Sequence, residues 1–324
     1  MTRTVPALLT ALLLAAGCAG APVPSTATEV AAPRGVPAGM GSGEDDGVFP
    51  RTVGHVAGST TIASQPTRVA VLSTGQLDAA LTLGVLPVAA TRGDGAGLVP
   101  DYLATAFPDD AAGLARLLDV GTRAEPGVES VAAAAPDLVL VNSSVDPGVR
   151  AQLAAVAPTV VTEGTGVNWK QDLLLLADAL GRTQQAQRLL DTFHTDAAAL
   201  GSSLRPAPTV SFVRANADRL RVFGVSSFVG SIAEDAGLAR PVSQQVDLTS
   251  VDISPEQLDA ADGDRIFYGV QGPDPALLTG AGLWAGLRGV AAGGAVRVDD
   301  DVWFLNAGPA AARLVLDELV ATLG

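Results

Sequence analysis

The sequence predicts an α/β protein made of two lobes and a connecting helix. Between Val48 and Thr162, short apolar or β-branched segments alternate with helical patterns, and the same alternation resumes after residue 205. Residues 168–204 hold no proline and repeat apolar side chains at helical spacing. Because alternating strands and helices are typical of sheets covered by helices, each of the two regions is expected to form one α/β lobe.

The first region contains the elements expected of a mostly parallel sheet. Residues 137–141, DLVLV, are apolar after the first position, as expected for a strand that is covered on both faces. The other predicted elements of this region are strands at 68–72, 86–89 and 158–162 and helices at 76–84 and about 128–134.

The second region repeats this pattern after a long helix. Residues 168–204 are predicted as one helix, with a break near Gly181 left open. The later predicted elements are strands at 209–213, 220–223, 265–268 and 295–298 and helices at 228–237 and 309–323. The expected fold is therefore two Rossmann-like lobes joined by a single long helix, with a ligand cleft between them at the carboxyl ends of the strands.

The only cysteine, Cys18, ends a segment that reads as a secretory signal. Residues 1–17 have a basic start, a short apolar core and small residues before the cysteine. This ending resembles the lipobox of bacterial lipoproteins, which implies that Cys18 is lipidated and anchors the chain to the cell membrane. Ordinary secretion is the alternative, since Ala15 stands where the lipobox prefers leucine.

The predicted organisation follows from these segments. Residues 18–46 are rich in Ala, Pro, Gly and Ser and are expected to form a flexible tether after the signal at 1–17. The N-terminal lobe is then predicted at 47–166, the connecting helix at 167–204 and the C-terminal lobe at 205–324.

Composition narrows the possible partners. The chain of 324 residues has a formal net charge of −14, which argues against nucleic acid as a partner. Two histidines and one cysteine leave little material for a zinc or manganese site, so neither a metal site of the protein's own nor a cofactor is expected.

Four segments in order resemble class III solute-binding lipoproteins of ABC importers, the family that binds iron siderophores and cobalamin. They are FPRTVGHVAGSTTIASQPTRVAVLSTGQLDAALTLGVLPVAA (49–90), VGTRAEPGVESVAAAAPDLVLVNSS (120–144), FGVSSFVGSIAEDAGLARP (223–241) and ISPEQLDAADGDRIFYG (253–269). The resemblance implies a monomeric extracytoplasmic protein that captures a ferric siderophore and delivers it to the permease for iron uptake. Cobalamin or haem is the alternative ligand, expected of a neutral aromatic cleft instead of an arginine-rich one.

For a ferric siderophore, the candidate binding residues are arginines and aromatic residues at the carboxyl ends of predicted strands. The chelate already encloses the iron, so the protein needs cations for its charge and rings for its surface, and no direct iron ligand. Arginine donates directed hydrogen bonds and stacks on π-systems. The predicted ligand-binding residues are Arg92, Arg123, Arg214, Tyr268 and Trp303.

Two glutamates have a different expected role. By the resemblance, Glu129 and Glu256 match the acids that project one from each lobe and pair with arginines of the two permease subunits. An acid in the first turn of a helix is also favoured by the helix dipole alone. Local helix stabilisation is therefore the alternative to docking for both residues.

Catalysis is not expected. The segment GVSSF at 224–228 begins like a nucleophile elbow but ends on phenylalanine where the motif needs glycine. The two histidines, His55 and His194, fall in the predicted N-terminal hairpin and on the long helix, where surface or packing roles are expected. A secreted hydrolase is kept as the enzymatic alternative, distinguished by turnover.

Overall fold

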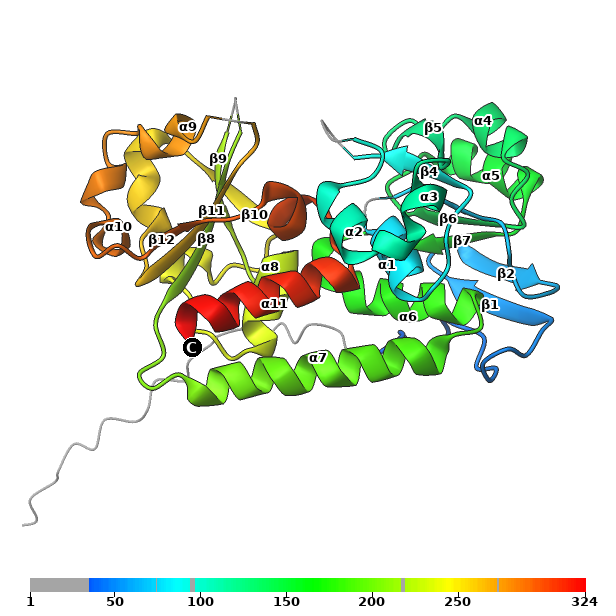
Figure 1. The fold of residues 1–324 in the computed structure, drawn as a ribbon, viewed down its shortest axis with the longest axis horizontal. Helices are drawn as coiled ribbons and strands as arrows, with labels where there is room; N and C mark the ends of the chain where they lie inside the picture. The colour runs from blue at the N-terminus through cyan, green and yellow to red at the C-terminus, as the bar shows by residue number, and fades with distance from the viewer. Residues whose placement is uncertain (1–34, 74, 94–96, 217–218, 273) are drawn as a thin grey trace, which may run out of the picture.

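The chain forms two α/β lobes side by side, with a long helix running beneath both (Figure 1). The computed structural model describes residues 35–73, 75–93, 97–216, 219–272 and 274–324. The predicted signal sequence, Cys18 and most of the predicted tether lie outside these residues. Within them, every helix is too short or too polar to cross a membrane.

The N-terminal lobe is built on a parallel sheet of five strands in the order β5-β4-β3-β6-β7. The strands are β3 (Val69–Val71), β4 (Ala89–Arg92), β5 (Leu118–Thr122), β6 (Leu138–Asn142) and β7 (Thr159–Thr162). The chain leaves β3 toward β4 and later returns on the other side of β3 to form β6. This switch in direction creates a crevice at the carboxyl ends of the strands. An antiparallel hairpin, β1 (Arg51–His55) and β2 (Gly58–Ile62), lies next to β7.

Helices cover both faces of this sheet. On one face, α4 (Val128–Ala133) and α5 (Pro147–Val156) bury Val131 and Leu153 against strand residues such as Val139. The Asp146 side chain starts α5 by accepting hydrogen bonds from the backbone amides of Gly148 and Val149. Short helices precede β5: α2 (Asp101–Ala106), η1 (Pro108–Asp110) and α3 (Ala111–Leu114).

The other face of the sheet packs on α1 (Gln76–Thr82) and α6 (Trp169–Ala179). Their leucines join alternate strand side chains, such as Val69 and Val71, in the largest core cluster of the protein. Because successive strand side chains point to opposite faces, the fully buried β3 and β6 supply both cores.

The C-terminal lobe has a mixed sheet in the order β10-β9-β8-β11-β12. The strands are β8 (Val210–Ala215), β9 (Leu220–Phe223), β10 (Ser250–Ile253), β11 (Arg265–Val270) and β12 (Ala295–Arg297). Strands β8, β11 and β12 are parallel, as predicted for a Rossmann-like lobe, whereas β9 and β10 pair antiparallel. The β8–β9 pair is antiparallel because the two strands follow each other closely in the chain without a crossover helix, whereas α8 and η3 lie between β9 and β10.

The helices of the C-terminal lobe are short, apart from the last. They are α8 (Phe228–Asp235), η3 (Val242–Gln244), η4 (Pro255–Ala261), α9 (Ala276–Thr279), η5 (Trp284–Gly286), α10 (Arg288–Ala291), the π-helical turn η6 (Asp301–Leu305) and α11 (Pro309–Leu323). The sheet face opposite α8 and α11 forms a separate core that includes Leu258 of η4 and Trp284 of η5.

The predicted single connecting helix is two helices. After the short turn η2 (Gly166–Asn168), α6 belongs to the N-terminal lobe, and only α7 (Thr183–Ser203) runs beneath both lobes (Figure 1). Gly181 lies between them with φ +68°, and a Cβ there would come within 3.0 Å of the Phe49 ring. Glycine is therefore the residue that suits this reversal of the chain.

The described end of the predicted tether packs on the folded body. Ser42 donates from its amide and its hydroxyl to the Asp178 carboxylate, each at 2.7 Å. Gly41 forms a β-bridge with Gly54, and the guanidinium of Arg51 donates to the Asp45 carbonyl. The ordered body thus starts several residues before residue 47.

The two lobes share one core and several polar contacts between described residues. Trp169 of α6 packs edge-on against Phe228 of α8, with ring centroids 5.9 Å apart, and its Nε1 donates to the Ser231 hydroxyl of α8 at 3.1 Å. Lys170, next to it, forms an ion pair with Asp235 of α8. In addition, the Asp78 carboxylate of α1 accepts from the first amides of α11. The lobes are therefore fastened together along the side that faces α7.

Candidate ligand cleft

A cavity of about 270 Å³ lies between the two lobes. The N-terminal lobe contributes Arg123, Asn142 and the Gly164–Gly166 loop, which lie at or just after the carboxyl ends of strands. The rest of the lining comes from the C-terminal lobe: Phe223, Ser227, Phe228, Val229, Thr249, Trp303, Phe304, Leu305 and Ala307. The cavity therefore occupies the position that the strand order predicts.

Backbone interactions fix the N-terminal side of the cleft. The Arg123 amide donates to the Arg92 carbonyl at 3.0 Å, which continues the β4–β5 pairing past the strand end. The Asn142 amide donates to the Ser73 hydroxyl at the switch point of the sheet. Gly164 has φ +79°, and a Cβ there would lie 2.3 Å from the Asn142 Cβ, so the loop needs glycine at this position.

Aromatic rings form the C-terminal side. Phe223 ends β9 and lies 4.7 Å from the Phe304 ring, measured between centroids. Phe304 belongs to η6, and Phe228 begins α8. The Ser227 hydroxyl caps α8 by accepting from the Gly230 amide at 2.9 Å, which fixes Phe228 at the cleft.

The cleft is mainly aromatic and polar, with a single cation. Arg123 is the only charged side chain among the described residues that line it. Arg123 also borders a smaller adjoining cavity, which Asp78 and Asp301 line. Burial raises the pKa of Asp301, and the neighbouring Asp299 and Asp300 raise it further.

Two of the predicted arginines are paired within their own lobes. Arg92 is exposed, and its Nε lies 3.1 Å from an Asp119 carboxylate oxygen. Arg214 is only 8% exposed and forms a two-pronged ion pair with Asp300, with both N–O distances at 2.7 Å. Neither side chain lines the cavity between the lobes.

The two predicted aromatic residues pack mainly inside the C-terminal lobe. Tyr268 was expected at a strand end, but β11 continues to Val270, and the Tyr268 ring lies 5.0 Å from Trp284. Trp303 is 1% exposed and stacks on Phe267 at 4.9 Å. Its Nε1 donates to the Glu318 carboxylate, while part of the residue borders the cleft.

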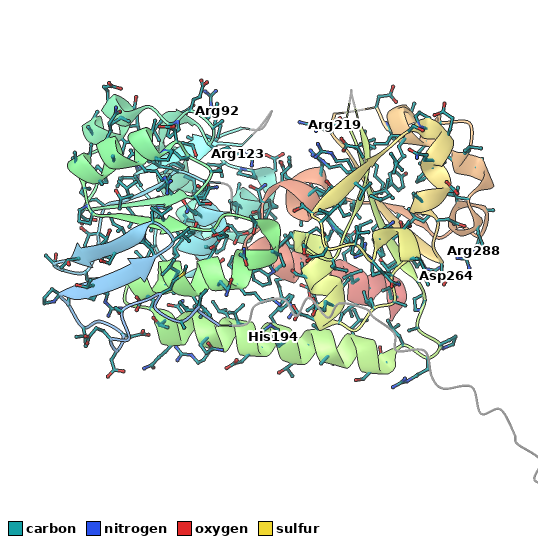
Figure 2. The ribbon with its side chains drawn as sticks, turned by 180° about the vertical axis from the view of Figure 1, so that it is seen from behind. Arg92, Arg123, His194, Arg219, Asp264 and Arg288 are labelled. Carbon is teal, nitrogen blue, oxygen red and sulfur yellow. The ribbon has the colours of Figure 1, made fainter. Side chains whose placement is uncertain are left out.

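The phenylalanines of the cleft lining were not predicted as binding residues from the sequence. Phe223 and Phe228 stand at the two ends of FGVSSF, which belongs to a segment that carried the family resemblance, so a signal for them existed. Phe304 lies in a π-helical turn that no periodicity marked. Arg219, at the exposed β8–β9 turn, faces the same opening as Arg92 and Arg123 from the other lobe (Figure 2).

Glu129 and Glu256 lie on different lobes, and both are exposed. Glu129 is in the first turn of α4. Glu256 is in the first turn of η4, where Ser254 and Gln257 form a capping box. A hydrogen bond from the Ser254 side chain lowers the pKa of Glu256, so this acid is held in its charged form.

The histidines lie away from the cleft. His55 Nε2 is 3.0 Å from the Thr60 hydroxyl in the hairpin. His194 lies on α7, on the side of the molecule opposite the labelled arginines of the N-terminal lobe (Figure 2). Over the part of the chain that the structure describes, no three His, Cys, Asp or Glu side chains form a group that could hold a metal ion.

Two α/β lobes with a cleft between them and a helix beneath both define a class of solute-binding proteins. Residues 69–299 match the Periplasmic binding protein family, and the chain belongs to that family. It is 33% identical to the probable siderophore-binding lipoprotein YfiY of Bacillus subtilis, over 83% of this chain and 86% of the relative. It is 24% identical to the Fe(3+)-citrate-binding protein YfmC of the same species, over 81% and 82% of the two chains.

Solved structures show the same fold. The Staphylococcus aureus protein SirA, complexed with staphyloferrin B, matches with a TM-score of 0.74 and 26% identity, over 84% of this chain and 98% of SirA. Bacillus subtilis FeuA, complexed with ferri-bacillibactin, matches with a TM-score of 0.69 at 18% identity, over 84% and 97% of the two chains. The predicted fold and family are thereby confirmed.

Proposed function

We propose that the protein captures a ferric siderophore in the cleft between its lobes and delivers it to an ABC permease for iron uptake. The observation that carries this proposal is the pairing of one cation, Arg123, with a wall of aromatic rings, in a chain whose relatives are named for siderophores and ferric citrate. Siderophore donors already enclose the iron, so the protein needs to bind only the outside of the chelate.

The lining offers the interactions that such a chelate needs. Arg123 supplies charge and directed hydrogen bonds for anionic oxygens. Asn142, Thr165 and Thr249 add side chains that form hydrogen bonds. The rings of Phe223, Phe228 and Phe304 offer apolar surface to aromatic or aliphatic parts of the ligand.

Cobalamin or haem is the second candidate ligand. It is favoured by one feature, since the described lining holds four aromatic residues and a single cation instead of several arginines. Cobalamin, which has no carboxylate, would use the rings and leave Arg123 with its present surroundings, whereas the propionates of haem would pair with Arg123.

Anchoring and docking complete the proposal. Lipidation of Cys18 would hold the protein at the outer side of the cell membrane, and the protein would act as a monomer. Glu129 and Glu256, exposed on different lobes, would pair with arginines on the two permease subunits. The ligand is bound and released unchanged, so no chemical step and no cofactor is assigned to the protein.

The test is a tryptophan-fluorescence titration of residues 19–324, which retain every described residue. The panel contains ferric catecholate, hydroxamate and citrate chelates, cobalamin, haemin and the iron-free siderophores. Saturable quenching by one ferric class below about 1 μM, confirmed by calorimetry, supports the proposal and identifies the chelate. Binding only to cobalamin or haemin would replace the ligand, and no binding to any of them would refute the proposal.

A further inference from the structure

The carboxylate of Asp172 is directed at the backbone of the cleft loop. Asp172 lies in the first turn of α6, behind the Gly164–Gly166 wall. Its Oδ1 accepts from the Glu163 amide at 3.0 Å, and its Oδ2 accepts from the Gly164 amide at 2.8 Å. In the described part of the chain, these two amides are its hydrogen-bond donors, so both carboxylate oxygens serve the same loop.

This loop touches both lobes. Gly164 packs on Asn142, and a Cβ at Gly166 would lie 2.7 Å from the Phe228 amide nitrogen. A second side-chain bond to this loop comes from Ser143, directly after β6, whose hydroxyl donates to the Glu163 carbonyl at 2.8 Å. A small displacement of the loop would therefore change the distance between the cleft wall and the aromatic side.

Burial disfavours the ionised form of the Asp172 carboxylate. Burial raises the pKa of Asp172 from 3.8 to about 6, and the nearby Glu163 carboxylate adds to the rise, while the amides of Gly164 and Glu163 oppose it. Two other cavities border Asp172, and among their described lining residues Glu163 is the only other titratable group. The Asp172 carboxylate therefore changes its charge near pH 6, in mildly acidic surroundings.

We infer that Asp172 is a positioning residue of the cleft, which fixes the Gly164–Gly166 wall while it is ionised and loosens it when it is protonated. An ionised carboxylate accepts from both amides, whereas a protonated one has a single strong acceptor left. Ligand affinity then falls as the pH drops through the titration of Asp172. The inference rests on the proposed function only for the identity of the ligand.

The first arm of the test needs no ligand. The amide resonances of Glu163 and Gly164 are followed by NMR between pH 4.5 and 8 in the unliganded protein. Both are expected to shift with a midpoint near pH 6, and the midpoint should vanish in Asp172→Asn. Ser143→Ala removes a bond from the same loop without removing the titrating group, so its midpoint should stay near pH 6. Glu163→Gln should move the midpoint to lower pH.

The second arm measures the affinity for the ferric chelate that the panel identifies, at pH 7.5 and pH 5. The dissociation constant at pH 5 divided by that at pH 7.5 should be at least about fivefold larger in the original protein than in Asp172→Asn. Because both proteins meet the same chelate, this comparison cancels any effect of protonating the chelate itself. Equal ratios, or amides that titrate alike in Asp172→Asn, would overturn the inference. If the amides behave as expected but only cobalamin or haemin binds, the siderophore proposal fails, while the positioning role is upheld with that ligand.

Discussion

Replacing Lys170 with methionine should cost about 3–5 kcal/mol of the free energy of unfolding, as expected for breaking a buried ion pair. The Lys170 side chain is fully buried, and that of its partner Asp235 is 3% exposed. Methionine preserves the length of the side chain but leaves the Asp235 carboxylate buried without the lysine charge. His194 Nε2, at 3.7 Å from an Asp235 oxygen, is too distant to replace the short lysine contact.

The assay is urea unfolding, with tryptophan fluorescence and circular dichroism as independent probes. Coincident transitions would justify a two-state free energy for a protein of two lobes. Arg221→Met provides the control, because Arg221 pairs with Asp252 at 2.9 Å but the aspartate is 58% exposed. Loss of this exposed pair should cost less than about 1 kcal/mol.

A double-mutant cycle with Asp235→Leu tests whether the two charges act as a pair. The double variant should be less destabilised than the sum of the single variants, because no buried charge is left uncompensated. A cost below about 1 kcal/mol for Lys170→Met, or strictly additive single effects, would refute the buried link between the lobes.

Three further predictions concern the cleft and its surroundings. Arg123→Ala should weaken binding of an anionic ferric chelate by about ten- to hundredfold in calorimetry, because it removes charge-assisted hydrogen bonds; an unchanged dissociation constant would contradict its role. Gly164→Ala should lower the free energy of unfolding by about 1–3 kcal/mol, as measured in urea, since its backbone is left-handed and Asn142 fills the space. Charge reversal of both Glu129 and Glu256 should abolish cellular iron uptake while calorimetry shows unchanged binding; normal uptake would rule out docking through these acids.

Strands whose side chains are buried on both faces were predictable from the sequence, whereas the half-exposed strands were predicted unevenly: β12 was expected, and β5 and β10 were not. All five residues of β6 are buried, and its apolar run identified it. In β5 only Val120 is buried, while the other positions are polar or exposed, so no pattern marked it. The predicted strand at 86–89 begins instead at Ala89, because Leu86 and Pro87 lie in the loop that follows the turn at Leu83 and Gly84.

The position of the cleft followed from the strand order, but the partners of its charges did not. Arg123 follows a strand and lines the cavity, as expected from the sequence. Arg214 was expected just after a strand, but it lies within β8, and Asp300, 86 residues later, neutralises it. Such a pairing depends on how β12 is placed beside β11, and local sequence carries no information about that placement.

Lys170 is the only lysine of the chain, and its amine is buried where the lobes meet. Amine-reactive reagents should therefore leave this side chain unmodified while the lobes stay together. The rate of modification at residue 170, followed by mass spectrometry, would then measure how often the junction between α6 and α8 opens. The reactivity of Lys170 therefore reports on separation of the lobes at a single residue, without any engineered label.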